Sequence, residues 1–353
     1  MKLDYHLTAS GSGLVAEAQQ AESLGYQGAF VGEIAHDPFV ALALPAAATS
    51  SIQLGTCIAL AFARNPMTTA IAANDLQLLS NGRLVLGLGS QIKAHVTRRF
   101  SMPWSHPAPR MREFILAMRA IWAAWNDGMR LNFTGEFYSH TLMPPFFNPG
   151  ANPYGPPVVA LAAVGTRMTE VAGEVADALL CHGFTTESYL RTVTLPAVAR
   201  GRERAGAPRP VDVCIAPFVV TGTNEAEFQA AAAAVRNQVA FYASTPAYRG
   251  VLEVHGWGDL QTELQAMTKA DRWSEMGSLI DDEILAAFAV VGEPAEVGPM
   301  LCERFGDMAD RVSLYVPYDP GTALEPVISY LLAAGSGKSA AAAAAAPAPP
   351  GAG

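Results

Sequence analysis

Short apolar runs alternate with longer amphipathic segments along most of the chain. Eight of these runs are predicted to be strands, because they are short, rich in apolar and β-branched residues, and bounded by turn residues. They are Leu3–Thr8, Ala29–Glu33, Ile52–Ala61, Arg83–Gly89, Val158–Ala162, Asp177–Cys181, Val211–Thr221 and Arg311–Val316. Because a helical pattern follows each strand, the chain is predicted to form parallel strands linked by crossover helices.

Several of the intervening helices have readable ends. Gly13–Leu24 is followed by Gly25, Pro66–Leu79 by Asn81-Gly82, and Met111–Trp125 by Asp127-Gly128. Glycine or asparagine is typical just past the end of a helix. Eight strand–helix pairs fit a (β/α)8 TIM barrel better than a doubly wound open sheet, which usually has about five to seven strands. The predicted fold class is therefore α/β, a (β/α)8 TIM barrel.

Two stretches exceed the simple repeat: about residues 90–156, after strand four, and about 244–290, before the last βα unit. Insertions in barrels usually lie on the βα loops, where the chemistry takes place. We therefore expect the proline- and aromatic-rich segment Met143–Pro149 to form a wall of the active site. The barrel is predicted to span residues 1–334, and the composition of 335–353 predicts a low-complexity, disordered tail.

Composition narrows the possible partners and the location. Of 353 residues, 50% are apolar and 16% are charged, which is typical of a globular protein. The net charge of −9 and the absence of a basic tract argue against nucleic acid and anionic membranes as partners. The N-terminus does not resemble a secretory signal, so we expect a cytoplasmic protein. Four scattered cysteines predict no metal site and no redox pair.

Candidate proton-transfer residues follow the second and fourth strands. Glu33 and His36 follow strand two and could exchange a proton with a substrate. In the alternative interpretation, Asp37-Pro38 starts a helix and Glu33 pairs with a neighbouring strand. After strand four comes His95, and His6 on strand one is expected to pack inside the barrel.

Basic residues surround His95, and they suit an anionic ligand. They are Lys93, Arg98 and Arg99. An exposed helix face is the alternative for this cluster.

A phosphate site is predicted after strands five and six. Gly165-Thr166-Arg167 leads directly into a helix, whose first N–H groups can bind an anion. The next strand ends at Cys181-His182-Gly183-Phe184, which adds a second glycine and further donors. Each segment alone is also compatible with an ordinary capped turn, but together, on adjacent strands, they favour phosphate binding.

Several of these segments together resemble a known family. Besides Glu33, they are Leu54-Gly55-Thr56-Cys57-Ile58, Arg64-Asn65-Pro66, the run from Asn81 to Gly89, Ala163-Val164-Gly165 and Val175–Leu179. Over residues 1–334 the chain resembles the luciferase-like monooxygenase superfamily. More narrowly, it is similar to actinobacterial oxidoreductases that use the deazaflavin coenzyme F420.

The resemblance implies roles for particular residues. It implies a bulged third strand beneath the ring system of the cofactor, with a non-proline cis peptide between Cys57 and Ile58. It also implies a set of residues that hold the cofactor phosphate: Val164, Gly165, Thr166 and Arg167, with His182, Gly183 and Phe184. Sugar-phosphate dehydrogenases of this family place histidine directly after the strand-two carboxylate, but here that position is Ile34. Sugar-phosphate oxidation is therefore disfavoured.

The leading functional hypothesis is hydride transfer between F420 and a small hydrophobic or cyclic organic substrate. In this hypothesis His36, Glu33 or His95 handles a proton, and three aromatic residues line the substrate pocket: Phe39, Phe62 and Trp104. One alternative is a monooxygenase that uses reduced FMN, and another is a barrel that binds the coenzyme without catalysis. A homodimer is expected to form through the apolar helix Pro38–Ser50, which contains Leu42, Leu44 and Pro45.

Overall fold

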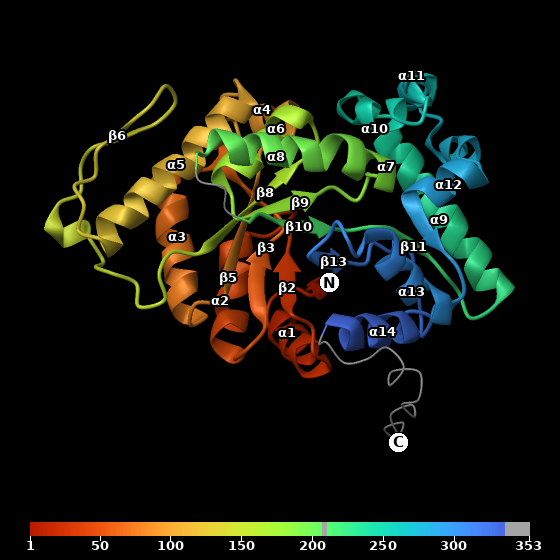
Figure 1. The fold of residues 1–353 in the computed structure, drawn as a ribbon, viewed down its shortest axis with the longest axis horizontal. Helices are drawn as coiled ribbons and strands as arrows, with labels where there is room; N and C mark the ends of the chain where they lie inside the picture. The colour runs from red at the N-terminus through yellow and green to blue at the C-terminus, as the bar shows by residue number, and fades with distance from the viewer. Residues whose placement is uncertain (207–209, 336–353) are drawn as a thin grey trace. The chain divides into compact units, whose positions relative to one another are not determined.

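The computed structural model describes residues 1–206 and 210–335, which form two compact units (Figure 1). The larger unit comprises Asp4–His182 and Arg191–Cys214. The smaller unit comprises Met1–Leu3, Gly183–Leu190 and the chain from Ile215 onward. The tail predicted for 335–353 lies outside the described residues, apart from Gly335 at the end of the last helix.

Parallel strands form the centre of the larger unit. They are β1 (Lys2–His6), β2 (Gly28–Val31), β3 (Gln53–Thr56), β4 (Ala59–Leu60), β5 (Leu84–Gly89), β8 (Val158–Ala163), β9 (Ala178–Cys181) and β10 (Asp212–Ile215). Neighbours in the sheet follow the order of the chain, β1-β2-β3-β5-β8-β9-β10, and β4 also pairs with β5. This order has no reversal, whereas a doubly wound sheet reverses its strand order at the ligand site. The prediction of a barrel-type sheet is therefore confirmed.

The helices of the larger unit connect these strands. They are α1 (Gly13–Leu24), α2 (Pro38–Ala48), α3 (Pro66–Leu79), α4 (Lys93–Arg98), α5 (Pro107–Asn126), α6 (Thr166–Val175) and α8 (Leu195–Arg204), with the short turns η1 (Ala61–Ala63), η2 (Pro145–Phe147) and η3 (Leu190–Thr194). The predicted limits of α1 and α3 are confirmed. Gly25 ends α1 with φ of 93°, a conformation that glycine adopts without steric cost. Helix α5 begins before the predicted Met111, at Pro107, since proline fits the first turn of a helix.

The inner face of the sheet carries a compact apolar cluster. Its buried members are Phe30, Val85, Ala160, Ala178 and Leu180. On the outer side α5 packs against α3, where Trp122 Nε1 donates to the Ala70 carbonyl at 3.2 Å. Both faces of the sheet are therefore covered, as expected for parallel strands with crossover helices.

The smaller unit contains strands β11 (Phe218–Val220), β12 (Ala289–Val291) and β13 (Arg311–Ser313). Strands β11 and β12 pair in parallel. The helices are α7 (Glu187–Tyr189), α9 (Glu225–Ala243), α10 (Arg249–Glu253), α11 (Gly258–Lys269), α12 (Asp282–Phe288), α13 (Pro294–Phe305) and α14 (Glu325–Gly335), with η4 (Pro246–Tyr248) and η5 (Trp273–Leu279). The predicted strand Val211–Thr221 is two strands, because Pro217 cannot donate a ladder hydrogen bond.

The aromatic segment Met143–Pro149 does not form the predicted wall at the strand ends. It follows a small hairpin of β6 (Phe133–Thr134) and β7 (Ser139–His140), and it belongs to the connection that runs from α5 to the start of β8 (Figure 1). Beyond it, the Tyr154 hydroxyl donates to Asn81 at 2.9 Å, just before β5 begins. The segment is a connection from a helix to a strand, so it reaches the end of the sheet where the strands begin.

Among the helices of the described residues, none is both apolar enough and long enough to cross a membrane.

Candidate cofactor and substrate site

Because the strands of the larger unit are parallel, their C-terminal ends lie along one edge of the sheet. Functional residues of (β/α)8 barrels gather at this edge. The residues that end or follow the strands here include His6, Glu33, Cys57, Ser90, Val164 and His182. The sequence favoured a packed position for His6, but the side chain is exposed to solvent, so that expectation is wrong. Protein atoms around the imidazole lower the pKa of His6, and the Glu17 carboxylate opposes this effect.

The third strand is interrupted by a bulge between β3 and β4. The peptide bond between Cys57 and Ile58 is cis, which confirms what the resemblance implied. Cys57 N donates to the Val31 carbonyl at 2.8 Å, so the bulge stays attached to β2. Burial and then the Asp4 carboxylate raise the pKa of the Cys57 thiol to about 11. The thiol is therefore protonated at neutral pH.

Two glycines of β5 make room for this bulge. A β-carbon at Gly87 would lie 1.9 Å from the Thr56 carbonyl oxygen, and one at Gly89 would lie 1.9 Å from Ile58 Cδ1. The Thr56 hydroxyl donates to the Gly87 carbonyl at 2.6 Å. Any side chain at Gly87 would push the two strands apart, so the Gly-Leu-Gly sequence has a packing role here.

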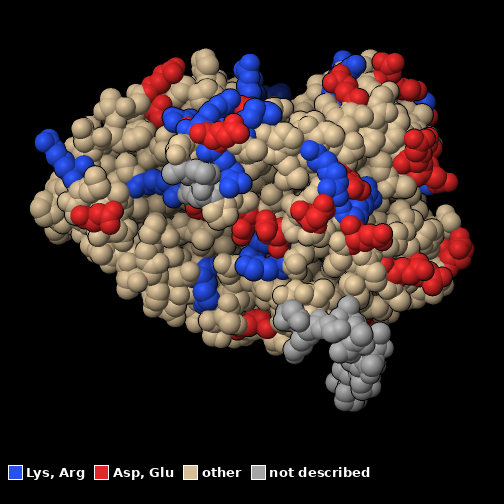
Figure 2. All heavy atoms as spheres, viewed as in Figure 1, with Lys and Arg blue, Asp and Glu red and all other residues tan. Residues whose placement is uncertain are grey.

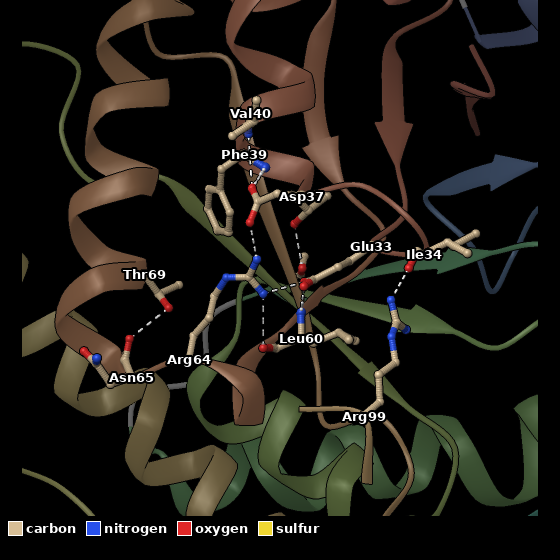
Figure 3. Close-up of polar contacts among 12 residues, drawn as sticks. Glu33, Ile34, Asp37, Phe39, Val40, Leu60, Arg64, Asn65, Thr69 and Arg99 are labelled. Atoms are coloured by element: carbon tan, nitrogen blue, oxygen red, sulfur yellow. Dashed lines mark hydrogen bonds and ion pairs between the residues drawn. The ribbon is translucent and has the colours of Figure 1, made fainter. Parts of the chain in front are cut away.

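Arg64 holds the loop after β2 in place (Figure 3). Its guanidinium binds the Glu33 carboxylate at 2.5 Å and the Asp37 carboxylate at 2.5 Å. Glu33 also accepts from Leu60 N at 2.8 Å, and its side chain is only 8% exposed. Asp37 caps α2 by accepting from the backbone N–H groups of Phe39 and Val40. The interpretation of Glu33 as a pairing residue and of Asp37 as a helix cap therefore matches the geometry.

The candidate histidines lie outside this network. His36 is exposed and makes no hydrogen bond or ion pair among the described residues. Although Glu33 and Asp37 lie close to His36 in sequence, they do not orient its ring, because both carboxylates bind Arg64. His95 is also exposed, on α4.

Arg99 joins the loops that follow β5 and β2. Its guanidinium donates to the Ile34 carbonyl, close to His36 in sequence (Figure 3). Lys93 and Arg98 are exposed on α4 and make no ion pair among residues 1–206 and 210–335. The loop that carries His36 is thus held at both ends while its imidazole remains accessible.

The start of α6 has the features predicted for a phosphate site. Gly165 precedes the helix with φ of −86° and ψ of 152°, and a β-carbon there would have no neighbour within 4 Å. No side chain caps this end, and within the described residues no acceptor binds the backbone N–H groups of Thr166 and Arg167. These donors and the positive end of the helix dipole suit a phosphate group.

Helix α6 is fixed from the other side by α8. A β-carbon at Gly173 would lie 2.3 Å from the Val198 carbonyl oxygen, so the two helices approach closely. Glu170 binds Arg200 and Arg204, each at 2.8 Å. Figure 2 shows acidic and basic side chains lying among one another over these two helices. The open start of α6 therefore has a rigid support.

The other predicted phosphate residues differ in character. Burial lowers the pKa of His182 to about 4, so its ring is neutral at neutral pH and adds no positive charge. Gly183 and Phe184 belong to the smaller unit. The Phe184 ring is buried and stacks on Phe288 at 4.4 Å, which leaves only its backbone for a ligand.

Two of the three predicted substrate-pocket residues lie in the core. Phe62 is fully buried, with the Arg110 guanidinium 4.5 Å from its ring centroid. Phe39 is buried beneath Arg64 at 5.3 Å. Only Trp104 is partly exposed, and its ring meets Phe62 edge-on at 5.6 Å. An arginine guanidinium lies against each of the rings of Phe39 and Phe62, and their place in a substrate pocket stays a prediction.

The chain is similar in sequence to known proteins and in fold to solved structures. An uncharacterized protein of Mycobacterium tuberculosis is 50% identical over 313 residues, which cover 88% of this chain and 92% of the relative. The 5,10-methylenetetrahydromethanopterin reductase of Methanolobus tindarius is 29% identical over 283 residues, covering 78% and 82%. Among solved structures, the coenzyme F420 dependent tetrahydromethanopterin reductase from Methanopyrus kandleri aligns with a TM-score of 0.73 and 21% identity, covering 93% of this chain and 96% of that one.

The structural likeness shows that the fold class is the (β/α)8 TIM barrel, as the sequence predicted. Residues 3–311 match the luciferase-like monooxygenase family. The chain belongs to this family, which confirms the resemblance carried by the strand-end segments.

We expect Glu33→Ala to lower the free energy of unfolding by on the order of 2 kcal/mol, because it removes charge-assisted hydrogen bonds. It leaves the Leu60 amide without its acceptor and Arg64 with Asp37 as its only carboxylate partner among the described residues. Urea unfolding followed by circular dichroism measures the change. Glu275→Ala is the matched control, since the Arg272–Glu275 pair is half exposed, and it should leave the unfolding midpoint unchanged. Equal losses in the two variants would contradict the role given to Glu33.

Proposed function

We propose that this protein is an F420-dependent oxidoreductase that transfers a hydride between the deazaflavin and a small hydrophobic or cyclic organic substrate. The observation that carries the proposal is the open start of α6, where Gly165 precedes backbone donors without acceptors among the described residues. The name of the Methanopyrus structure, a coenzyme F420 dependent reductase, supports the choice of cofactor. The family name supports a second candidate, a monooxygenase that uses reduced FMN. We also propose a cytoplasmic location.

Each part of the site has a role in this proposal. Val164, Gly165, Thr166 and Arg167 would hold the cofactor phosphate, and the Cys57–Ile58 bulge would support the ring system. A bound deazaflavin would supply the hydride chemistry, which no amino-acid side chain provides. His36, exposed on a loop anchored by Arg64 and Arg99, would exchange a proton with the substrate.

We predict that the protein binds F420 more tightly than FMN, and that Gly165→Val weakens F420 binding by about tenfold or more, a loss of roughly 1.4 kcal/mol. The added side chain would cover the backbone donors, but it meets no atom within 4 Å, so the fold should persist. Fluorescence titration with each cofactor measures the affinities.

Gly250→Val serves as the control for the substitution at the start of α6, because its β-carbon would meet only Tyr189, at 3.9 Å. It should bind F420 like the parent. Tighter binding of FMN by the parent would favour the monooxygenase. Unchanged F420 binding by Gly165→Val would place the phosphate elsewhere.

For the proton-transfer role, we expect His36→Ala to slow coenzyme oxidation by roughly 10²–10⁴-fold, the usual cost of losing a general acid or base. Cofactor affinity should change little, because His36 is not part of the α6 site. Stopped-flow absorbance with a substrate that supports turnover measures the rate, and His95→Ala is the comparison variant. A rate within about threefold of the parent would transfer the role to His95, to His6 or to water.

We also propose a homodimer formed through α2 and α3, which pack against each other and expose apolar side chains. These are Val40, Leu44, Ile71, Leu78 and Leu79. Of the residues expected at this interface, Leu42 and Pro45 face the core instead. Leu44→Glu should shift the protein toward monomer in sedimentation, whereas Leu142→Glu, at an exposed site outside these helices, should not. A monomeric parent at micromolar concentration would refute the proposal.

A further inference from the structure

The smaller unit contains a group of aromatic rings that the assigned roles do not use. Phe184, Phe218 and Phe288 are fully buried and form its base. Three partly exposed tyrosines lie against this base, and we call them the tyrosine cluster: Tyr242, Tyr248 and Tyr315. Tyr315 stacks on Phe218 at 4.6 Å with an interplanar angle of 21°, and Tyr248 lies 5.5 Å from Phe184.

The hydroxyl groups of the tyrosine cluster are hydrogen-bond donors at neutral pH. The hydroxyls of Tyr242 and Tyr315 are 2.8 Å apart, so one donates to the other. Burial and then the bond to Tyr242 raise the pKa of Tyr315, and burial raises that of Tyr248 to about 12. Their protons therefore remain in place throughout the physiological range.

Tyr318, in the same unit, has a hydroxyl group with a structural role. The Tyr318 hydroxyl donates to the Val219 carbonyl at 3.1 Å and accepts from Thr221 N at 3.2 Å. Both of its bonds are to the backbone, and they tie the segment after β13 to β11. By contrast, the hydroxyl of Tyr315 meets another side-chain hydroxyl.

The backbone is adapted to the position of Tyr315. A β-carbon at Gly183 would lie 2.8 Å from Tyr315 Cδ1 and 3.0 Å from the Ala216 carbonyl oxygen. Gly183, which was predicted to approach the cofactor phosphate, thus gives the Tyr315 ring its space. Phe184 follows β9 and Tyr315 follows β13, and residues after strand ends carry function in this fold class.

We propose that the tyrosine cluster binds a flat, largely apolar ring that carries a hydrogen-bond-accepting oxygen, such as an aryl ketone. Aromatic rings stack on or meet edge-on the rings of the cluster, and a protonated phenol donates to a carbonyl oxygen. The rings on an apolar base favour a neutral ligand. This inference rests on the proposed function only in taking the ligand to be the substrate of hydride transfer.

The probe is acetophenone, compared with α-methylstyrene, which has nearly the same shape but lacks the acceptor oxygen. Equilibrium dialysis without any coenzyme measures both affinities. The parent should prefer acetophenone by about fivefold to tenfold, the value of one hydrogen bond of roughly 1–1.4 kcal/mol. Tyr315→Phe should lose this preference, and Tyr318→Phe, with its backbone bonds, should keep it.

Circular dichroism verifies that each variant is folded. If Tyr315→Phe unfolds, Tyr242→Phe takes its place and should likewise lose the preference for acetophenone. A parent that binds the two probes equally would overturn the proposal, and so would a loss of preference in Tyr318→Phe as large as in Tyr315→Phe. Because the coenzyme is absent, a failed F420 titration would refute the proposed function and leave this result intact. Conversely, F420 binding without acetophenone binding would refute only the role of the tyrosine cluster.

Discussion

The geometry of the larger unit depends on one steric constraint, the contact between the Thr56 carbonyl oxygen and Gly87. Only a residue without a β-carbon leaves room for that oxygen, since the added atom would lie 1.9 Å away. The contact lets the third strand bulge directly after Thr56. The bulge then turns the Ile58 carbonyl to accept from Glu33 N at 3.2 Å. The Glu33 carboxylate in turn receives the Leu60 amide and Arg64, which extends the assembly to the start of α2. A single glycine thus positions two loops at the strand ends, and both loops lie at the edge proposed for the cofactor.

Much of the fold could be predicted from local signals. The ends of α1 and α3 were readable because a glycine in the left-handed region or a capping asparagine with proline marks them in the sequence. The count of eight strand–helix pairs favoured the correct fold class, because short apolar runs and amphipathic segments are also local signals. Strand β12 was missed, since its three residues adjoin a helix within a predicted insertion and are too few to show a period.

The site was less predictable, because sequence position at a strand end does not determine where a side chain points. Phe62 has the residue type and the position expected for a substrate contact, but Arg110 covers its ring. Glu33 and Asp37 flank His36 in sequence, yet Arg64, more than 25 residues further along, takes both carboxylates. Such pairings depend on tertiary contacts with no local signature. Gly165 is different: its place before a helix was readable because a glycine there is a local feature, and the structure leaves the space above it open, so its role at a phosphate site stays a prediction.

The distribution of charge bears on the choice between F420 and FMN, because the deazaflavin has the longer anionic tail. The three basic residues after β5 predicted an anionic ligand, but their surroundings in the structure differ. Arg99 donates to the Ile34 carbonyl and lies 4.9 Å from the Phe100 ring, so its guanidinium is already used to hold a loop. Lys93 and Arg98 are exposed on α4, where water competes with any ligand and salt screens the attraction. Any contribution of Lys93 and Arg98 to a preference for the longer tail should therefore weaken as ionic strength rises. A phosphate at the proposed site, the start of α6, would meet backbone donors on a supported helix, so its contribution should depend less on salt than that of the exposed side chains.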